Sequence, residues 1–173
     1  MDDNKKEIMK RIEEAGDPEN YETTWDEKGV PISKKKSKVK MGRVSRAAGG
    51  RFELKVRKDL ESKGRVIDKW SNNVDLETGM LIPAKRKFNP FAKVLTIGVG
   101  FPDFVSIKKI SEGVYSVMGV EVKMNGTLSK VEKEKCAWYL KEGIFSEILI
   151  AKAVRDGRKI GIEYVDFKEK YGK

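Results

Sequence analysis

Two acids and a lysine in the middle of the chain have the types and the spacing needed to cut a phosphodiester bond. Asp103 lies at the open end of one expected strand, and Glu121 and Lys123 lie near the end of the next. A turn at 112–113 joins these strands into a hairpin, which can bring the two carboxylates together. Side chains alternate along a strand, so Glu121 and Lys123 share one face. Paired carboxylates beside a lysine suit a hard divalent cation and an activated water.

The motif resembles that of the PD-(D/E)xK nuclease superfamily, and the residues that carry the resemblance are Pro102, Asp103, Glu121 and Lys123. Gly100 before them and the order helix, strand, hairpin, helix, strand around them add to it. The resemblance covers about residues 51–151 and extends to archaeal Holliday junction resolvases and to small virus-type and RecB-like stand-alone nucleases. It implies an α/β fold with a restriction-endonuclease-like core, in which helices flank a central mixed β-sheet.

The resemblance also implies a site residue by residue. Asp103, Glu121 and the Val122 carbonyl group would bind Mg²⁺ or Mn²⁺, and Lys123 would orient the attacking water or offset charge on the phosphate. Glu53 matches a glutamate that often completes the metal site of such nucleases. It lies on the margin of the apolar stripe of a helix expected over 51–63, and an acid that favours the helix dipole is the alternative. The alternative for the whole group is a set of surface charges on a hairpin.

The composition restricts the chemistry that an enzyme of this sequence could use. The chain has 37 Lys and Arg residues against 27 Asp and Glu residues, no histidine and one cysteine, Cys136. A serine–histidine or cysteine–histidine mechanism is therefore excluded, and a zinc site is not expected. The formal net charge of +10 favours a polyanionic partner. The absence of glutamine beside abundant Lys, Glu and Ile resembles the bias of thermophile proteins.

The charge pattern divides the chain into three parts. We expect an N-terminal arm over 1–50, acidic to residue 33, then basic and in part disordered; a nuclease domain over 51–166; and a fraying tail over 167–173. The basic stretch is expected to be flexible and to follow a phosphate backbone, with a solubilising linker as the alternative. Its candidate phosphate contacts are Lys34, Lys35, Lys36, Lys38, Lys40, Arg43, Arg46 and Arg51.

Further candidate contacts to nucleic acid lie within the nuclease domain. Ser71 follows the first expected strand, where resolvases often use a serine, although Ser71 also suits an ordinary turn. Lys85, Arg86 and Lys87 adjoin aromatic residues that could stack on a base or simply close the core. Lys135 stands at the glutamine position of the Gln-x-x-x-Tyr pattern of RecB-like nucleases. It could contact the scissile phosphate, or its stem could lie along the core.

These observations predict a Mg²⁺-dependent deoxyribonuclease that cuts structured DNA, either a Holliday junction resolvase-like enzyme or a flap-type endonuclease. Such an enzyme would serve DNA repair or recombination, and a four-way junction with two symmetric scissile points implies a homodimer. No apolar run is long enough for a membrane span or a signal peptide, so we expect a cytoplasmic protein, within a host cell if viral. The alternatives are a non-catalytic nucleic-acid-binding protein that keeps the fold, a restriction-type enzyme and an RNA-directed nuclease.

Overall fold

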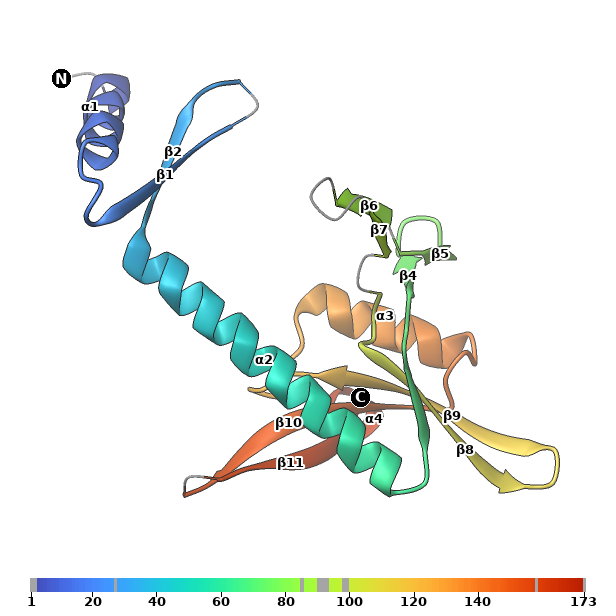
Figure 1. Ribbon diagram of the computed structural model, residues 1–173. Helices are drawn as coiled ribbons and strands as arrows, with labels where there is room; N and C mark the ends of the chain where they lie inside the picture. Colours follow the sequence, from blue (N-terminus) through green and yellow to red (C-terminus); the bar gives the residue numbers. More distant parts are fainter. Residues whose placement is uncertain are drawn as a thin grey trace. The chain divides into compact units, whose positions relative to one another are not determined.

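The chain forms two compact units, Met1–Gly50 and Arg51–Lys173, which are described separately. The computed structural model describes residues 3–26, 28–84, 100–157 and 159–172, and the backbone alone of residues 86–89 and 94–97. In these residues, four helices accompany eleven strands, which form one five-stranded sheet and three two-stranded sheets (Figure 1). No helix in the described parts of the chain has an apolar stretch long enough to cross a bilayer.

The first unit is a helix, a hairpin and the start of a second helix. Helix α1 (Asp3–Ala15) precedes strands β1 (Tyr21–Trp25) and β2 (Pro31–Lys35), which pair antiparallel. Helix α2 (Lys36–Ser62) follows β2 without a gap. The prediction of a flexible basic stretch over 34–51 was therefore wrong, because these residues end β2 and continue as α2. Lysine, arginine and alanine are strong helix formers, and the stretch contains no proline, so the helix tolerates the glycines within it.

The second unit is built on the five-stranded sheet, whose strand order is β11-β10-β9-β8-β3. Strands β9 and β10 are parallel and the other neighbours are antiparallel, so the sheet is mixed. The bounds of the strands are β3 (Val66–Lys69), β8 (Phe104–Ser111), β9 (Val114–Val122), β10 (Glu147–Asp156) and β11 (Lys159–Asp166). Helix α3 (Lys130–Lys141) connects the two parallel strands, as a parallel pair requires.

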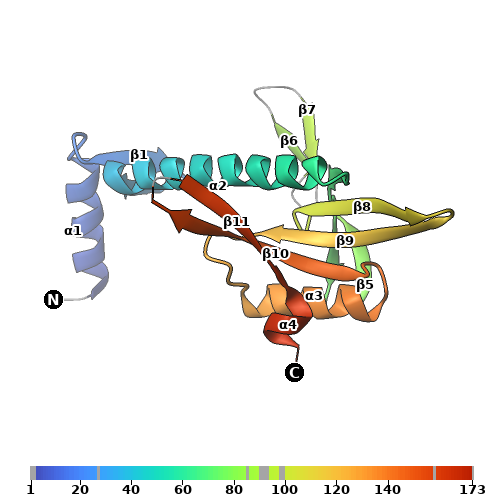
Figure 2. The ribbon, with the colours of Figure 1, turned by 90° about the horizontal axis from the view of Figure 1, so that it is seen from below.

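The second half of α2 covers one face of this sheet (Figure 2). Phe52, Val56 and Leu60 recur at intervals of four along the helix and are buried, as their spacing predicts. They pack in one cluster with Val120 of β9 and Ala151 of β10. Burial of a side chain of this size contributes about 1.5–3 kcal/mol, so these three residues hold the helix on the sheet.

Helix α3 covers the opposite face (Figure 2). Cys136 and Tyr139 of α3 pack against Ile148 and Ile150 of β10, and all four side chains are fully buried. Alternation along β10 sends these isoleucines to the α3 face and Ala151 to the α2 face. The expected α/β class, with helices on both faces of a mixed sheet, is confirmed.

Local signals set both ends of α3. The side chain of Ser129 accepts a hydrogen bond from the backbone of Glu132, whose own side chain accepts one from the backbone of Ser129, so the two residues form a capping box. Gly143 ends the helix with a φ of 67°. The tail, by contrast, was wrongly expected to fray. It forms helix α4 (Phe167–Tyr171), and Phe167 joins the core on the α3 side of the sheet.

Between β3 and β8 the chain forms two short hairpins. Strands β4 (Asn72–Asp75) and β5 (Met80–Pro83) pair antiparallel, as do β6 (Arg86–Asn89) and β7 (Val94–Ile97). Gly100 then returns the chain to β8. A Cβ atom at this position would lie only 2.2 Å from the carbonyl oxygen of Trp70, so only glycine fits there.

Candidate active site

The β8–β9 hairpin brings the two predicted acids to the same place. Phe104 pairs with Val120 across the strands, and Asp103 and Glu121 lie one residue beyond that pair. The backbone N–H of Asp103 donates to Oε2 of Glu121 at 3.1 Å, and the backbone N–H of Val122 donates to Oδ2 of Asp103 at 2.9 Å. Each acid is therefore held by the backbone of the opposite strand.

Lys123 joins this pair through its ammonium group. Its Nζ lies 3.1 Å from Oε1 of Glu121 and 2.6 Å from Oε1 of Glu132, at the start of α3. Glu132 also accepts the hydrogen bond from the backbone of Ser129, so the capping box fixes its position. Lys123 is thus shared by two carboxylates that come from different elements.

Burial raises the pKa of both acids. The side chain of Glu121 is 6% exposed. Its burial, together with the nearby charge of Asp103, raises the pKa of Glu121 from its ordinary 4.5 to about 7, although Lys123 opposes the rise. Burial also raises the pKa of Asp103, and the charge of Glu53 adds to this, while the Val122 N–H lowers it. Two buried carboxylates side by side favour the arrival of a positive charge.

For the neighbouring Lys123 and Glu132, by contrast, the surroundings favour the charged form of the side chain. Burial disfavours the charged form of Lys123, but its hydrogen bond to Glu132 and the charge of Glu121 outweigh burial and raise the pKa of Lys123. Burial likewise opposes ionisation of Glu132, yet the bonds from Lys123 and Ser129 lower the pKa of Glu132. The lysine therefore stays a cation and Glu132 stays an anion at neutral pH.

Glu53 lies close enough to act on Asp103 electrostatically, but it is engaged elsewhere. Its Oε2 lies 2.7 Å from Nζ of Lys69 on β3, and that ammonium also lies 4.6 Å from the centroid of the Phe104 ring. Within the part of the chain that the structure describes, no three acidic or cysteine side chains form a group that could hold a metal ion. The structure therefore brings Asp103, Glu121, Val122 and Lys123 together, and places Glu53 in an ion pair beside them.

The donor set fits a hard cation rather than a soft one. Asp103 and Glu121 offer carboxylate oxygens from two adjacent strands. Mg²⁺ and Mn²⁺ prefer such oxygen ligands, usually one or two carboxylates together with water and phosphate oxygens. The chain has no histidine, and burial together with the charges of Glu121 and Glu132 raises the pKa of the Cys136 thiol, which disfavours the thiolate that a metal would need.

The candidate contacts to nucleic acid fall on both units. In the first unit, Lys36, Lys40 and Arg43 lie within about 60° of one another around α2, at roughly 100° per residue, and form one exposed basic stripe. Arg43 is 4.0 Å from Oε2 of Glu22. The other bases from Lys34 to Arg46 are also exposed, as is Arg51 at the start of the second unit.

The structure describes the side chains of two further candidates in the second unit, Ser71 and Lys135. Ser71 is exposed, and its carbonyl group accepts the N–H of Ala84. Lys135 is half-buried, with its ammonium 5.7 Å from the centroid of the Phe101 ring, so its stem lies along the core edge. Lys85 and the side chains of Arg86 and Lys87 lie outside the described residues.

Two residues next to the acids were missed by sequence reasoning about the site. Glu132 bonds to Lys123 and Lys69 bonds to Glu53, and the sequence assigned neither residue a role in the site. The capping box could have marked Glu132 as a fixed acid, but its bond with Lys123 depends on where α3 docks.

No family model, curated protein or solved structure matches this chain.

Proposed function

We propose that the protein is a metal-dependent DNA endonuclease of the PD-(D/E)xK type, with its active site in the second unit. The observation that supports this proposal most strongly is the pair Asp103 and Glu121, buried side by side with Lys123 against Glu121. A pair of buried like charges is costly for folding, and one ammonium does not offset three nearby carboxylates. Costly arrangements of this kind cluster at functional sites.

The proposed site assigns a role to each residue. Asp103, Glu121 and the Val122 carbonyl group would hold Mg²⁺ or Mn²⁺, which when bound lowers the pKa of its water and offsets phosphate charge. Lys123 would donate hydrogen bonds to the attacking water or to the scissile phosphate. Glu132 keeps Lys123 protonated and holds its ammonium at the site. Glu53 would act on the site through its charge.

We further infer that the second unit contains a restriction-endonuclease-like core. The support is the order α2, β3, β8, β9, α3, β10 and the mixed sheet that these strands form. In this arrangement Asp103 directly precedes β8 and Glu121 lies near the end of β9. Strand β10 pairs with β9 in parallel. The fold alone carries no activity, so the proposal depends on the acids.

The proposed substrate is structured DNA, such as a four-way junction or a flap. The exposed basic stripe of α2 and the net charge of +10 suit a phosphate backbone. Cleavage of a four-way junction at two symmetric points would require a homodimer with paired sites. A protein that remains monomeric on junction DNA, as measured by analytical ultracentrifugation, would favour the flap-type activity.

A substrate panel tests this proposal. Duplex, single-stranded, flap and four-way-junction DNAs would be incubated with the full chain and Mg²⁺ or Mn²⁺. Asp103→Asn and Lys123→Met should each lower the cleavage rate by at least about a hundredfold, while binding in EDTA is retained. Glu112→Gln, at the exposed turn of the same hairpin, is the matched control and should cleave normally. Full activity of Asp103→Asn would refute the assignment.

A non-catalytic nucleic-acid-binding protein is the second candidate. It is favoured by one observation, namely that Lys123 already neutralises one oxygen of Glu121. Such a protein would bind DNA with a steep salt dependence and would cut no member of the panel with either metal. Matched RNA strands in the same panel would reveal an RNA-directed nuclease.

A further inference from the structure

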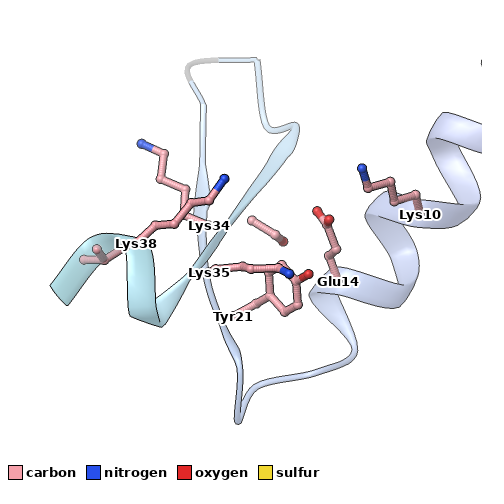
Figure 3. Close-up of a pocket in the computed structure, with 8 residues that line it drawn as sticks. Lys10, Glu14, Tyr21, Lys34, Lys35 and Lys38 are labelled. Carbon is pink, nitrogen blue, oxygen red and sulfur yellow. The ribbon is translucent and has the colours of Figure 1, made fainter. Parts of the chain in front are cut away.

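The first unit contains a cavity of about 550 Å³ whose walls come from three elements. Helix α1, the β1–β2 hairpin and the first turns of α2 line it, and it is open to solvent (Figure 3). The polar residues that Figure 3 labels around it are Lys10, Glu14, Tyr21, Lys34, Lys35 and Lys38. All of them belong to the first unit, so the cavity shares no residue with the candidate active site.

The fold of the unit brings these side chains together from distant parts of the sequence. Lys10 and Glu14 are one helical turn apart on α1 and therefore lie on the same side of it. Tyr21 and Lys35 are directly opposite in the hairpin, and the Lys35 ammonium lies 5.8 Å from the centroid of the Tyr21 ring. Lys38 is in the first turn of α2. The Glu14 carboxylate is turned toward the hairpin (Figure 3).

The cavity has an excess of positive charge within a stretch of chain that is rich in acids. Four lysines and one glutamate line it, which leaves a net charge of +3. In the described part of the first unit, no carboxylate lies within 4.0 Å of any of these four ammonium groups. Lys6, Arg11 and Arg43 of the same unit are each paired with an acid. Among the residues that line the cavity, Glu14 alone carries a carboxylate, so an anion there would meet an excess of ammonium groups.

We propose that this cavity binds a phosphorylated nucleotide. Lys10, Lys35 and Lys38 would hold the phosphate group, whereas Lys34 points away from Lys10 and Glu14 (Figure 3). The ring of Tyr21 and the side chain of Val39 would form an apolar wall for the sugar or base. Glu14 would accept a hydrogen bond from a sugar hydroxyl or a base amino group. The volume lies within the roughly 300–1,000 Å³ of small-molecule sites and exceeds what a phosphate ion alone needs.

This site goes beyond the proposed nuclease activity and does not depend on it. The same chemistry is offered by a free mononucleotide and by the phosphorylated end of a nucleic-acid strand. Binding at the cavity would give the protein a second point of attachment, distinct in kind from the basic stripe of α2. That stripe can follow any phosphate backbone, whereas the cavity would accept one phosphate group with its nucleoside.

Isothermal titration calorimetry of the full chain in EDTA tests the proposal without cleavage. AMP should bind at one site per chain, and adenosine at least about tenfold more weakly, because adenosine lacks the phosphate that accepts charge-assisted hydrogen bonds. Lys10→Ala should weaken AMP binding by about tenfold on the same grounds. Lys5→Ala is the matched control, because it removes the same charge from α1 outside the cavity. All of these lysines are exposed, so the variants should fold.

Further arms of the experiment identify the source of the phosphate. A tetrathymidylate with a 5′-phosphate should bind more tightly than the same strand without it, and Lys10→Ala should abolish the difference, if the cavity takes strand ends. An AMP-binding cavity that ignores the strand phosphate would be a site for free nucleotides. Asp103→Asn should bind AMP normally, so loss of cleavage leaves this result unaffected. No saturable AMP binding, or equal weakening by Lys5→Ala and Lys10→Ala, would overturn the proposal.

Discussion

The second unit should lose stability as the pH rises, because Glu121 is buried and ionises late. Replacing Glu121 with glutamine should remove this pH dependence. The unfolded chain ionises Glu121 near 4.5, whereas the folded protein retains the proton until about pH 7. Stability is therefore fully present below pH 4.5 and is lost as the pH rises through about 7. The rise in pKa from 4.5 to about 7 corresponds to about 3 kcal/mol, most of it lost between pH 5 and pH 8.

A glutamine at this position keeps one oxygen for the N–H of Asp103 but has no proton to lose in this range. The free energy of unfolding of the variant, relative to the natural protein, should therefore grow by about 2–3 kcal/mol between pH 5 and pH 8. Urea unfolding followed by tryptophan fluorescence measures this difference. Trp70 and Trp138 report the core of the second unit, and Trp25→Phe in both proteins removes the exposed tryptophan of the first.

Two further measurements make the result specific. Glu134→Gln changes an exposed acid on α3 and should leave the pH dependence of unfolding unchanged. Mg²⁺ at pH 8 should raise the stability of the natural protein, because a ligand that binds only the folded state adds to its stability, but should not raise that of Glu121→Gln. If the natural protein and Glu121→Gln lose stability in parallel from pH 5 to pH 8, within about 0.5 kcal/mol, the account of a buried, reluctantly ionised Glu121 is wrong.

Four other changes test the helix cap beside Lys123, the packing of the sheet and the basic stripe of α2. Glu132→Gln keeps the capping box but removes the charge that raises the pKa of Lys123, so the alkaline limb of the pH–rate profile should move to lower pH. Glu132→Ala should in addition lower the thermal stability measured by circular dichroism, by about 1 kcal/mol. Gly119→Ala should cost about 1–3 kcal/mol in urea unfolding, because its Cβ would lie 2.9 Å from Cγ of Pro102. Replacing both Lys40 and Arg43 with alanine should reduce the salt slope of DNA binding, measured by fluorescence anisotropy, by about 2.

Much of the second unit could be predicted from local patterns. The four-residue spacing of Phe52, Val56 and Leu60 indicates a helix with one apolar face, and these side chains are buried on the sheet. A hairpin turn between two apolar segments brings the ends that carry Asp103 and Glu121 together, and a register shift between Lys109 and Ser111 then sets the two acids opposite each other. These features depend on neighbours in the sequence or on a single tight turn.

For the basic stretch of the N-terminal arm, the prediction from local sequence was wrong. Its glycines and single-sign charge suggest a flexible linker, yet Lys36–Ser62 is one helix. Helix growth adds one hydrogen bond per residue once a nucleus exists, so a segment that packs its apolar face can extend into residues that would not form a helix alone. The composition of the basic stretch does not show that the following segment, which packs on the sheet, can supply the nucleus for helix growth.

The sequence by itself determined the residue types of the candidate site and the hairpin that carries its two acids, because both follow from a short stretch of chain. Only the tertiary structure decided their partners. Glu132 reaches Lys123 because α3 docks on the sheet, and Lys69 holds Glu53 because α2 packs beside β3. The lysines around the cavity of the first unit come from a helix, a strand and a second helix. Contacts between such elements depend on how their faces pack, and packing is a property of the whole fold rather than of any segment.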